Sequence, residues 1–219
     1  DESAQDDLLI KTEDWKFEER LSKEFEAVGF FISDHPLNQF TEIFNDYKII
    51  DYASFTSEED LKDSNIAATL LKIQERKTAK GNSYAVLKLT DLSSVFELFI
   101  FSDVLELNRE ILREGSSLIL TLFKNTSNDE NRLTRINVQK IASLKDLFDS
   151  PINEVSFNIR SEMQIEKIST ILKDQGKTIV NINLDIEDNI LKFRLKNARK
   201  LDRKSLNLLR NHEIQAIIN

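Results

Sequence analysis

The sequence predicts an α+β protein with three successive parts: short helices, then a five-stranded β-barrel, then a small α/β terminal domain. Apolar residues recur at helical spacing up to residue 63, and period-two alternation dominates residues 64–145. Strand and helix signals are mixed over residues 146–219. Hydrophobic residues make up 40% and charged residues 31% of the chain, as in globular proteins, although residues 1–12 lack periodicity and are predicted to be a flexible arm.

Residues 13–63 are predicted to be a helical linker. Apolar side chains from Trp15 to Val28 follow helical spacing, and Gly29 can end that helix as a left-handed cap. Pro36 then breaks the chain, because the residue before a proline avoids the helical region. A short helix is expected over residues 37–44, and a turn or a short helix over residues 52–61, where residues 56–59 resemble a helix start.

Residues 64–145 show five strand signals and one helix. The strands are expected at residues 66–74, 84–90, 95–101, 117–124 and 133–141, and the helix at 102–113. A helix between the third and fourth of five strands is the order of an OB-fold barrel. In the third strand, alternation does not decide whether Phe96, Leu98 and Ile100 face the core or Glu97, Phe99 and Phe101 do.

The terminal part, residues 146–219, has a different pattern that predicts helices packed against a sheet. Strands are expected at residues 154–160, 178–185, 190–196 and 214–218, and helices at 161–175 and 203–211. Gly176 is predicted to end the first of these helices. Phe193 and Leu195 are predicted to face the core, with the neighbouring cations pointing outward.

The charge of the chain is unevenly distributed. Residues 1–63 contain 6 Lys and Arg against 18 Asp and Glu, whereas the total net charge is only −8. The acidity therefore lies in the first part, and the other two parts are slightly basic. Local charge rather than total charge decides whether a surface can contact phosphates, so nucleic-acid binding is compatible with this composition.

Composition excludes several classes of site. There is no cysteine, so disulfides and thiolate metal sites are ruled out, and two histidines cannot form a histidine cluster. His35, alone in a loop before Pro36, is expected to be a structural hydrogen-bonding residue. The acidic start does not resemble an export leader, so a cytoplasmic protein is predicted; the absence of an initial Met suggests a segment of a longer chain.

Two blocks of sequence resemble a known family. The first runs Gly-Phe-Phe-Ile-Ser-Asp-His-Pro-Leu from Gly29 to Leu37, after an acidic helix end. The second covers residues 77–91, with the basic turn Thr-Ala-Lys-Gly-Asn and the alternating strand that follows it. Together and in this order, they are similar to the carboxy-terminal region of bacterial DNA polymerase III alpha subunits, although Phe31 and Asp34 replace a tyrosine and a glycine of the family pattern.

The resemblance implies a part of a replicative polymerase that has no active site of its own. The parent is a DNA-directed DNA polymerase, a nucleotidyltransferase whose palm holds two metal ions on three aspartates. That catalysis needs carboxylates that place metals about 3.5–4 Å apart, and no aspartate pair in this sequence has such a context. We therefore expect no catalytic residue, no metal and no cofactor in this chain. The terminal domain is implied to bind the tau subunit of the clamp loader.

Single-stranded DNA is the first expected partner, bound by the OB-fold. Such sites combine a basic groove with exposed aromatic side chains on which bases stack. The candidate residues surround the first hairpin and the third and fourth strands: Arg76, Lys77, Lys80, Tyr84, Lys88, Phe99 and Lys124.

The sliding clamp is the second expected partner. Residues Gln5, Asp7, Leu8 and Leu9 resemble the Gln-x-x-Leu-Phe type of peptide by which replication proteins dock on the clamp, with Leu9 in place of the phenylalanine. The family has such a peptide just upstream of the first block. An extended peptide would place its apolar anchors in a pocket of the clamp.

A basic stretch near the carboxy terminus is the third candidate, for DNA phosphates or for an acidic protein partner. Its cations are Lys192, Arg194, Lys196, Arg199 and Lys200.

Two alternative functions stay open for the chain as a whole. The barrel is either a scaffold without DNA contact, or the tRNA-binding OB domain of a class II aminoacyl-tRNA synthetase. The 74 residues after Lys145 are too few for the catalytic domain of such a synthetase.

Overall fold

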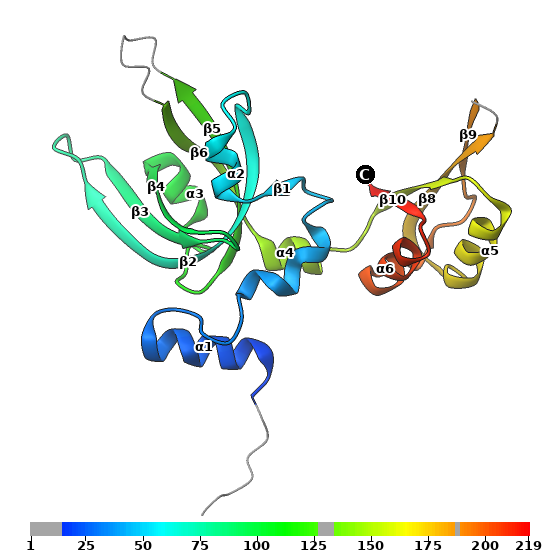
Figure 1. Cartoon of the computed structure of the whole chain (residues 1–219), viewed down its shortest axis with the longest axis horizontal. Coiled ribbons are helices and arrows are strands. Elements are labelled where there is room, and N and C mark those ends of the chain that lie inside the picture. Colours follow the sequence, from blue (N-terminus) through cyan, green and yellow to red (C-terminus); the bar gives the residue numbers. More distant parts are fainter. Residues whose placement is uncertain (1–14, 127–133, 187–188) are drawn as a thin grey trace, which may run out of the picture. The chain divides into compact units, whose positions relative to one another are not determined.

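The computed structural model describes residues 15–126, 134–186 and 189–219, and the chain divides into two compact units (Figure 1). Unit 1 contains the residues up to Thr41 together with Ile50–Leu144, and unit 2 contains Glu42–Ile49 together with Lys145–Asn219. Each unit has its own cluster of buried apolar side chains. The fold is α+β with mostly antiparallel strands, which confirms the predicted class.

The first helices form close to the predicted positions. Helix α1 (Phe17–Val28) ends at Gly29, whose φ of 77° is left-handed and whose N–H donates to Phe25, as predicted. The next segment, η1 (Pro36–Ile43), is a 3-10 helix. Helix α2 (Tyr52–Ser57) begins at the start of the predicted range 52–61, where the Asp51 carboxylate accepts a hydrogen bond from Ser54 N–H at 2.8 Å. The predicted helix start at residues 56–59 is therefore wrong.

The sheet of unit 1 has the order β4-β3-β2-β5-β6, with β1 paired to β2. All five predicted strands form, and the two-residue β1 is a sixth strand that the sequence did not predict. Hydrogen bonding joins every neighbour in this order, but no pairing is found between β4 and β6 within the described residues, so the sheet is open there. The strands are β1 (Ile49–Ile50), β2 (Asp63–Lys77), β3 (Ser83–Thr90), β4 (Val95–Phe101), β5 (Ser117–Thr126) and β6 (Thr134–Ser143).

Burial decides the orientation of β4. Phe96, Leu98 and Ile100 are buried in the core, whereas Phe99 and Phe101 are 53% and 61% exposed. Core side chains of β3 alternate in the same way. Helix α3 (Ser102–Asn108) places Leu105 against the same core but is shorter than the predicted 102–113.

Unit 2 contains a four-stranded sheet in the order β10-β7-β8-β9, in which β7 and β8 are parallel and the other pairs antiparallel. Helices α5 and α6 contribute Ile168, Leu206 and Leu209 to its core. A short helix, α4, was not predicted. The elements are α4 (Leu144–Asp149), β7 (Glu154–Ile159), α5 (Glu162–Ile171), β8 (Gln175–Ile186), β9 (Asn189–Arg194), α6 (Arg203–Asn211) and β10 (Gln215–Ile218). None of the described helices of either unit is long and apolar enough to cross a membrane.

Two predictions for unit 2 are wrong. Gly176 does not end α5, which stops at Ile171; it lies in β8, where the backbone of Lys200 passes so close that a Cβ would meet Lys200 N at 2.4 Å. Phe193 does not face the core but is 51% exposed. Leu195, just after β9, packs against the core of unit 2, so the prediction for Leu195 is confirmed, whereas no described residue of β9 itself belongs to that cluster.

Candidate nucleic-acid interface

The outer face of β2, β3 and β4 brings several of the predicted residues together. Residues directly opposite each other in an antiparallel pair share a face of the sheet. In the observed register Arg76 is opposite Tyr84, and Tyr84 is opposite Phe101. In the adjacent row, Val86 is opposite Phe99. A cation, a phenol and two phenyl rings therefore lie next to each other on one surface, which we call the aromatic face.

Basic residues border the aromatic face. Arg76, Lys77, Lys80 and Lys88 are all exposed, and Arg76 Nη2 donates to the side-chain oxygen of Gln74 at 2.9 Å. Lys77 and Lys80 flank and occupy the turn between β2 and β3, where Gly81 has a φ of 83° that favours glycine. Such a turn can place positive charge beside stacked bases, where the phosphates of a single strand run.

Lys124 lies apart from the other six predicted DNA-binding residues. It is on β5, which β2 separates from β3 in the sheet order. Its ammonium group donates to the Glu58 carbonyl at 2.6 Å and lies 4.7 Å from the ring centroid of the buried Phe55. This lysine is thus held against α2 and is a stabilising contact of unit 1.

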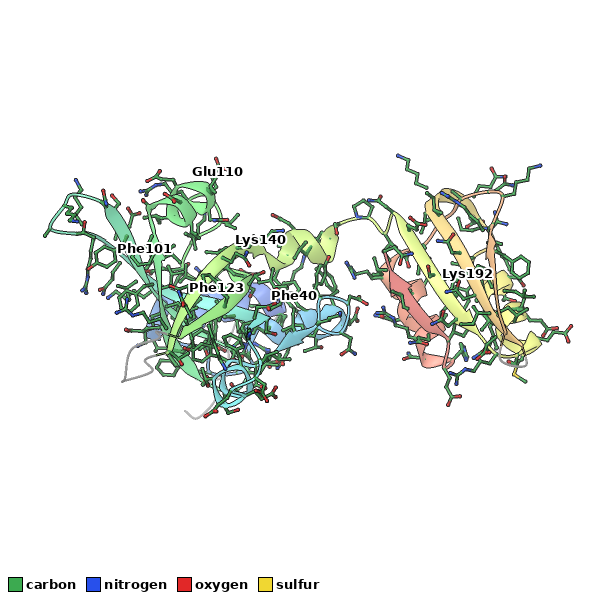
Figure 2. All side chains as sticks on the ribbon, turned by 90° about the horizontal axis from the view of Figure 1, so that it is seen from above. Phe40, Phe101, Glu110, Phe123, Lys140 and Lys192 are labelled. Atoms are coloured by element: carbon green, nitrogen blue, oxygen red, sulfur yellow. The ribbon has the colours of Figure 1, made fainter. Side chains whose placement is uncertain are left out.

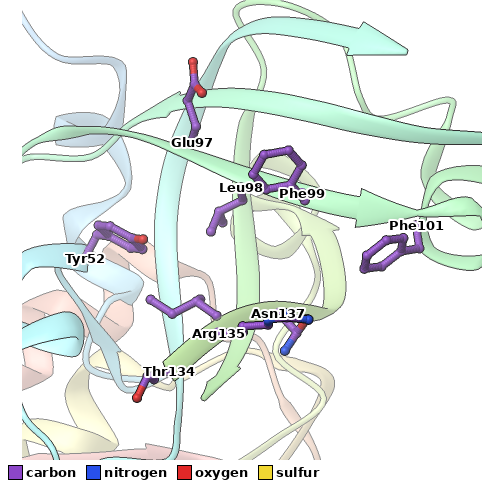
Figure 3. A pocket seen from close by; sticks show the side chains of 9 residues that line it. Tyr52, Glu97, Leu98, Phe99, Phe101, Thr134, Arg135 and Asn137 are labelled. Atoms are coloured by element: carbon purple, nitrogen blue, oxygen red, sulfur yellow. The ribbon is translucent and has the colours of Figure 1, made fainter. Parts of the chain in front are cut away.

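A pocket of about 460 Å³ lies where β4 and β6 are not paired (Figure 3). Phe99 and Phe101 line it from β4, and Arg135 and Asn137 from β6. The pocket contains both rings, a guanidinium group and an amide, a combination that can stack on and hydrogen-bond to a flat polar ring. Its remaining lining residues are Tyr52, Glu97, Leu98, Thr134 and Ile136.

Phe101, Arg135 and Asn137 were not predicted to be site residues from the sequence. Their alternation in the strands was visible, but which face was exposed depends on the packing of the sheet. Tyr52 was missed because nothing in the sequence links α2 to β4. Its ring stacks on Phe96 with centroids 3.8 Å apart and planes 5° apart, and burial raises the pKa of its phenol. Tyr52 is therefore a rigid, neutral wall of the pocket.

His35 is fixed by its surroundings. Its Nδ1 accepts the Leu37 N–H at 3.1 Å, and its Nε2 lies 3.4 Å from Thr90 Oγ1. Burial lowers the pKa of His35, although the carboxylates of Asp91 and Asp34 oppose this shift. The neutral ring therefore joins the loop before Pro36 to the end of β3.

Within the described residues, no group of three or more His, Cys, Asp or Glu side chains is arranged to hold a metal ion.

The basic stretch of unit 2 divides into two parts. Lys192, which Figure 2 labels, and Arg194 lie on β9. In the observed register they are opposite Asn183 and Asn181 of β8. Arg199 pairs with the beginning of β8 instead, and Lys200 N–H donates to the Asp174 carbonyl at 3.0 Å. Lys196 is exposed between the two parts.

The clamp-type residues Gln5, Asp7, Leu8 and Leu9 lie outside the described residues.

No protein-family model matches this sequence. Its similarity is to bacterial DNA polymerase III alpha subunits: 27% identity over 86% of the chain with the protein of Rickettsia conorii, and 29% over 74% with that of Rickettsia bellii. The alpha subunit of Halalkalibacterium halodurans is 26% identical over 77% of the chain. The matched regions are 17%, 14% and 15% of these relatives, so the chain spans less than a fifth of their length.

These observations define the chain as an α+β protein whose similarity is to a part of much longer DNA polymerase subunits. It is homologous to a part of the bacterial DNA polymerase III alpha subunit.

Proposed function

We propose that this chain is the non-catalytic, carboxy-terminal region of a bacterial replicative DNA polymerase alpha subunit, and that the sheet of unit 1 is an OB-fold that binds single-stranded template DNA. The similarity to DNA polymerase III alpha subunits supports the first part of this proposal. The observation that supports the second part most is the aromatic face, where Tyr84 and Phe101 are directly opposite each other.

The strand order supports the OB assignment. In the five long strands of unit 1, β2 pairs with β3 and β5, β3 pairs with β4, and β5 pairs with β6. Helix α3 connects the third of these strands to the fourth. OB-folds are partly open barrels that bind oligonucleotides on the face of their second and third strands and on two adjacent loops. The aromatic face belongs to the equivalent strands, β3 and β4.

Binding would combine stacking with charge neutralisation. Bases of a single strand would stack on Phe99, Phe101 and Tyr84, while Arg76 and Lys80 contact the phosphates. Stacking tolerates any base, as a template-binding surface requires. Arg135 and Asn137, which line the pocket beside the two phenyl rings, would add polar contacts to one base.

The other proposed partners are inferred from the resemblance to DNA polymerase III alpha subunits and from the charge pattern. We propose that the peptide containing Gln5, Leu8 and Leu9 binds the sliding clamp, and that unit 2 docks on the clamp-loader tau subunit in the cytoplasm. Tethering by such contacts would give a local concentration on the order of mM, which raises processivity without changing the chemistry. The polymerase reaction itself would belong to the remainder of the alpha subunit.

Fluorescence anisotropy of a labelled single-stranded oligonucleotide, measured with the whole chain over a salt series, tests the DNA-binding proposal. Binding should weaken linearly in log salt. Replacing both Tyr84 and Phe101 by alanine should weaken it by about 1–3 kcal/mol for each base that loses its stacking partner.

Leu107→Ala is the matched control, because Leu107 is 86% exposed on α3 and does not belong to the aromatic face. It removes an exposed apolar side chain and should leave the affinity unchanged. If the unmodified chain does not bind the oligonucleotide at low salt, the barrel is a scaffold and the DNA-binding proposal is refuted.

A further inference from the structure

Strand β9 is the least protected strand of unit 2. It is one of the two end strands of the four-stranded sheet and, within the part of the chain that the structure describes, pairs only with β8. Every described side chain from Ile190 to Arg194 is exposed, including three large apolar ones: Ile190 at 63%, Leu191 at 46% and Phe193 at 51%. An edge strand with exposed apolar side chains can pair with a further strand, and natural proteins usually shield such edges.

The two faces of β9 differ in character. Lys192 and Arg194 are opposite Asn183 and Asn181, on the polar face of the sheet. On that face, side-chain hydrogen bonds join Asn183 to Asn158 and Asn158 to Gln215, at 2.8 and 2.9 Å. Neither cation forms an ion pair with a residue that the structure describes.

The opposite face of β9 is apolar. Leu191 and Phe193 are opposite Leu184 and Ile182, which pack against the core of unit 2. The apolar surface of the core therefore continues outward onto β9, where it becomes exposed. A strand added beside β9 would extend this apolar row on one face and would meet two cations on the other.

The backbone of β9 is oriented for such an addition. Just after the strand, Leu195 N–H donates to the Val180 carbonyl of β8 at 2.9 Å. In an antiparallel pair, alternate residues direct both backbone groups toward the partner strand. The N–H and C=O groups of Phe193 and Leu191 therefore point to β8, and those of Lys192 and Arg194 point to the free edge.

We propose that the free edge of β9 binds an extended segment of a partner protein by strand addition, and that this segment alternates apolar with acidic residues. Main-chain hydrogen bonds to Lys192 and Arg194 would hold the segment, and its alternate side chains would give specificity. Its apolar side chains would pack beside Leu191 and Phe193, and its carboxylates would lie beside the two cations. The inference deepens the proposed docking role of unit 2 and rests on that role.

A second copy of this chain is a poorer occupant of the edge. In an antiparallel β9–β9 pair with matched faces, the cations of one copy would lie beside those of the other. Like charges directly opposite in a sheet are destabilising, whereas opposite charges stabilise the pair. The charge pattern of β9 therefore selects a partner that is acidic on this face.

The test uses the whole chain and two labelled synthetic peptides, one alternating valine with glutamate and one alternating valine with lysine. The glutamate peptide should bind more tightly to the unmodified chain. The double variant Lys192→Glu, Arg194→Glu should reverse the preference, with a change in affinity on the order of tenfold for two reversed charge pairs. The control variant Lys167→Glu, Lys173→Glu changes the same number of exposed cations, in and just after α5, and should keep the original preference.

Amide hydrogen exchange of the unmodified chain gives a second readout that does not depend on a variant folding. The glutamate peptide should slow exchange at Lys192 and Arg194, whose N–H groups point outward, and change Phe193 little. Equal affinity for both peptides, binding without this protection, or no binding to either peptide would overturn the proposal. Concentration-dependent self-association through β9 would also overturn it, in favour of a second copy. Because neither peptide is derived from tau, failure to bind tau alone would refute only the proposed docking partner.

Discussion

Asp46 and Arg210 form an ion pair across 164 positions of the sequence: Asp46 Oδ1 lies 2.5 Å from Arg210 Nη2. The Asp46 side chain is only 8% exposed, and a second cation, Arg203, has its Nη1 at 3.9 Å from Oδ2. Arg203 is held in turn by the carbonyls of Leu147 and Phe148. This cluster explains why residues 42–49, which precede the long strands of unit 1 in sequence, belong structurally to unit 2.

Replacing Asp46 by alanine should destabilise unit 2 strongly. The change leaves two partly buried guanidinium groups without their carboxylate, and breaking a buried pair in this way typically costs about 3–5 kcal/mol. Urea unfolding followed through the amide signals of β7 would measure the loss. Asp185→Ala is the control, since its pair with Arg160 has a 3.8 Å separation and is exposed, so the cost should stay below about 1 kcal/mol. Similar losses in both variants would contradict a special role for Asp46.

Gly176→Ala should disrupt the beginning of β8. The new methyl carbon would meet Lys200 N at 2.4 Å and Lys200 Cα at 2.5 Å, which are backbone atoms that must shift. Gly81→Ala is the comparison, because its Cβ would meet nothing within 4 Å and only its φ of 83° is unfavourable. We expect a larger drop in melting temperature for Gly176→Ala, together with loss of amide protection where residues 198–200 pair with β8. An equal or smaller drop than for Gly81→Ala would show that the segment moves aside easily.

His35 should make stability depend on pH near neutrality. Because burial lowers its pKa below the ordinary 6.5, the unfolded chain binds the proton more readily than the folded protein. Its contribution is therefore fully present above about pH 6.5 and is lost as the pH falls through the folded pKa, by at most about 1.4 kcal/mol per pH unit. Protonation would also remove Nδ1 as the acceptor of the Leu37 N–H. Urea midpoints between pH 7.5 and 5.5 should vary less in His35→Gln; an unchanged slope would rule out this histidine as the cause.

A salt titration of oligonucleotide binding should distinguish the contribution of the aromatic face from that of its basic border. Lys80→Ala should reduce the slope of log affinity against log salt by about 0.7, the effect of one phosphate contact on a single strand. Phe99→Ala should instead lower affinity by about 1–3 kcal/mol at every salt concentration, because stacking releases no counterions. If Phe99→Ala changes the slope and Lys80→Ala does not, the assigned roles are wrong.

The local pattern of the sequence was sufficient for most elements of the fold. The cap at Gly29, the alternation of β3 and the positions of the long strands depend on residues close together in the chain. The same kind of signal failed at Gly176, because a helix cap and a close backbone approach both favour glycine. The close approach comes from Lys200, which is 24 positions away.

The sequence by itself determined the α+β class and the order of the strands and helices except β1 and α4, and it predicted the candidate residues around the first hairpin. Tertiary structure alone decided that Phe99 and Phe101 are exposed, that Phe193 lies outside the core, and that Asp46 joins unit 2. For the three phenylalanines the physical reason is strand alternation, whereas Asp46 lies in a turn and its partner Arg210 is 164 positions away. A strand alternates between two faces whichever face is buried, and burial depends on which distant segments pack against it.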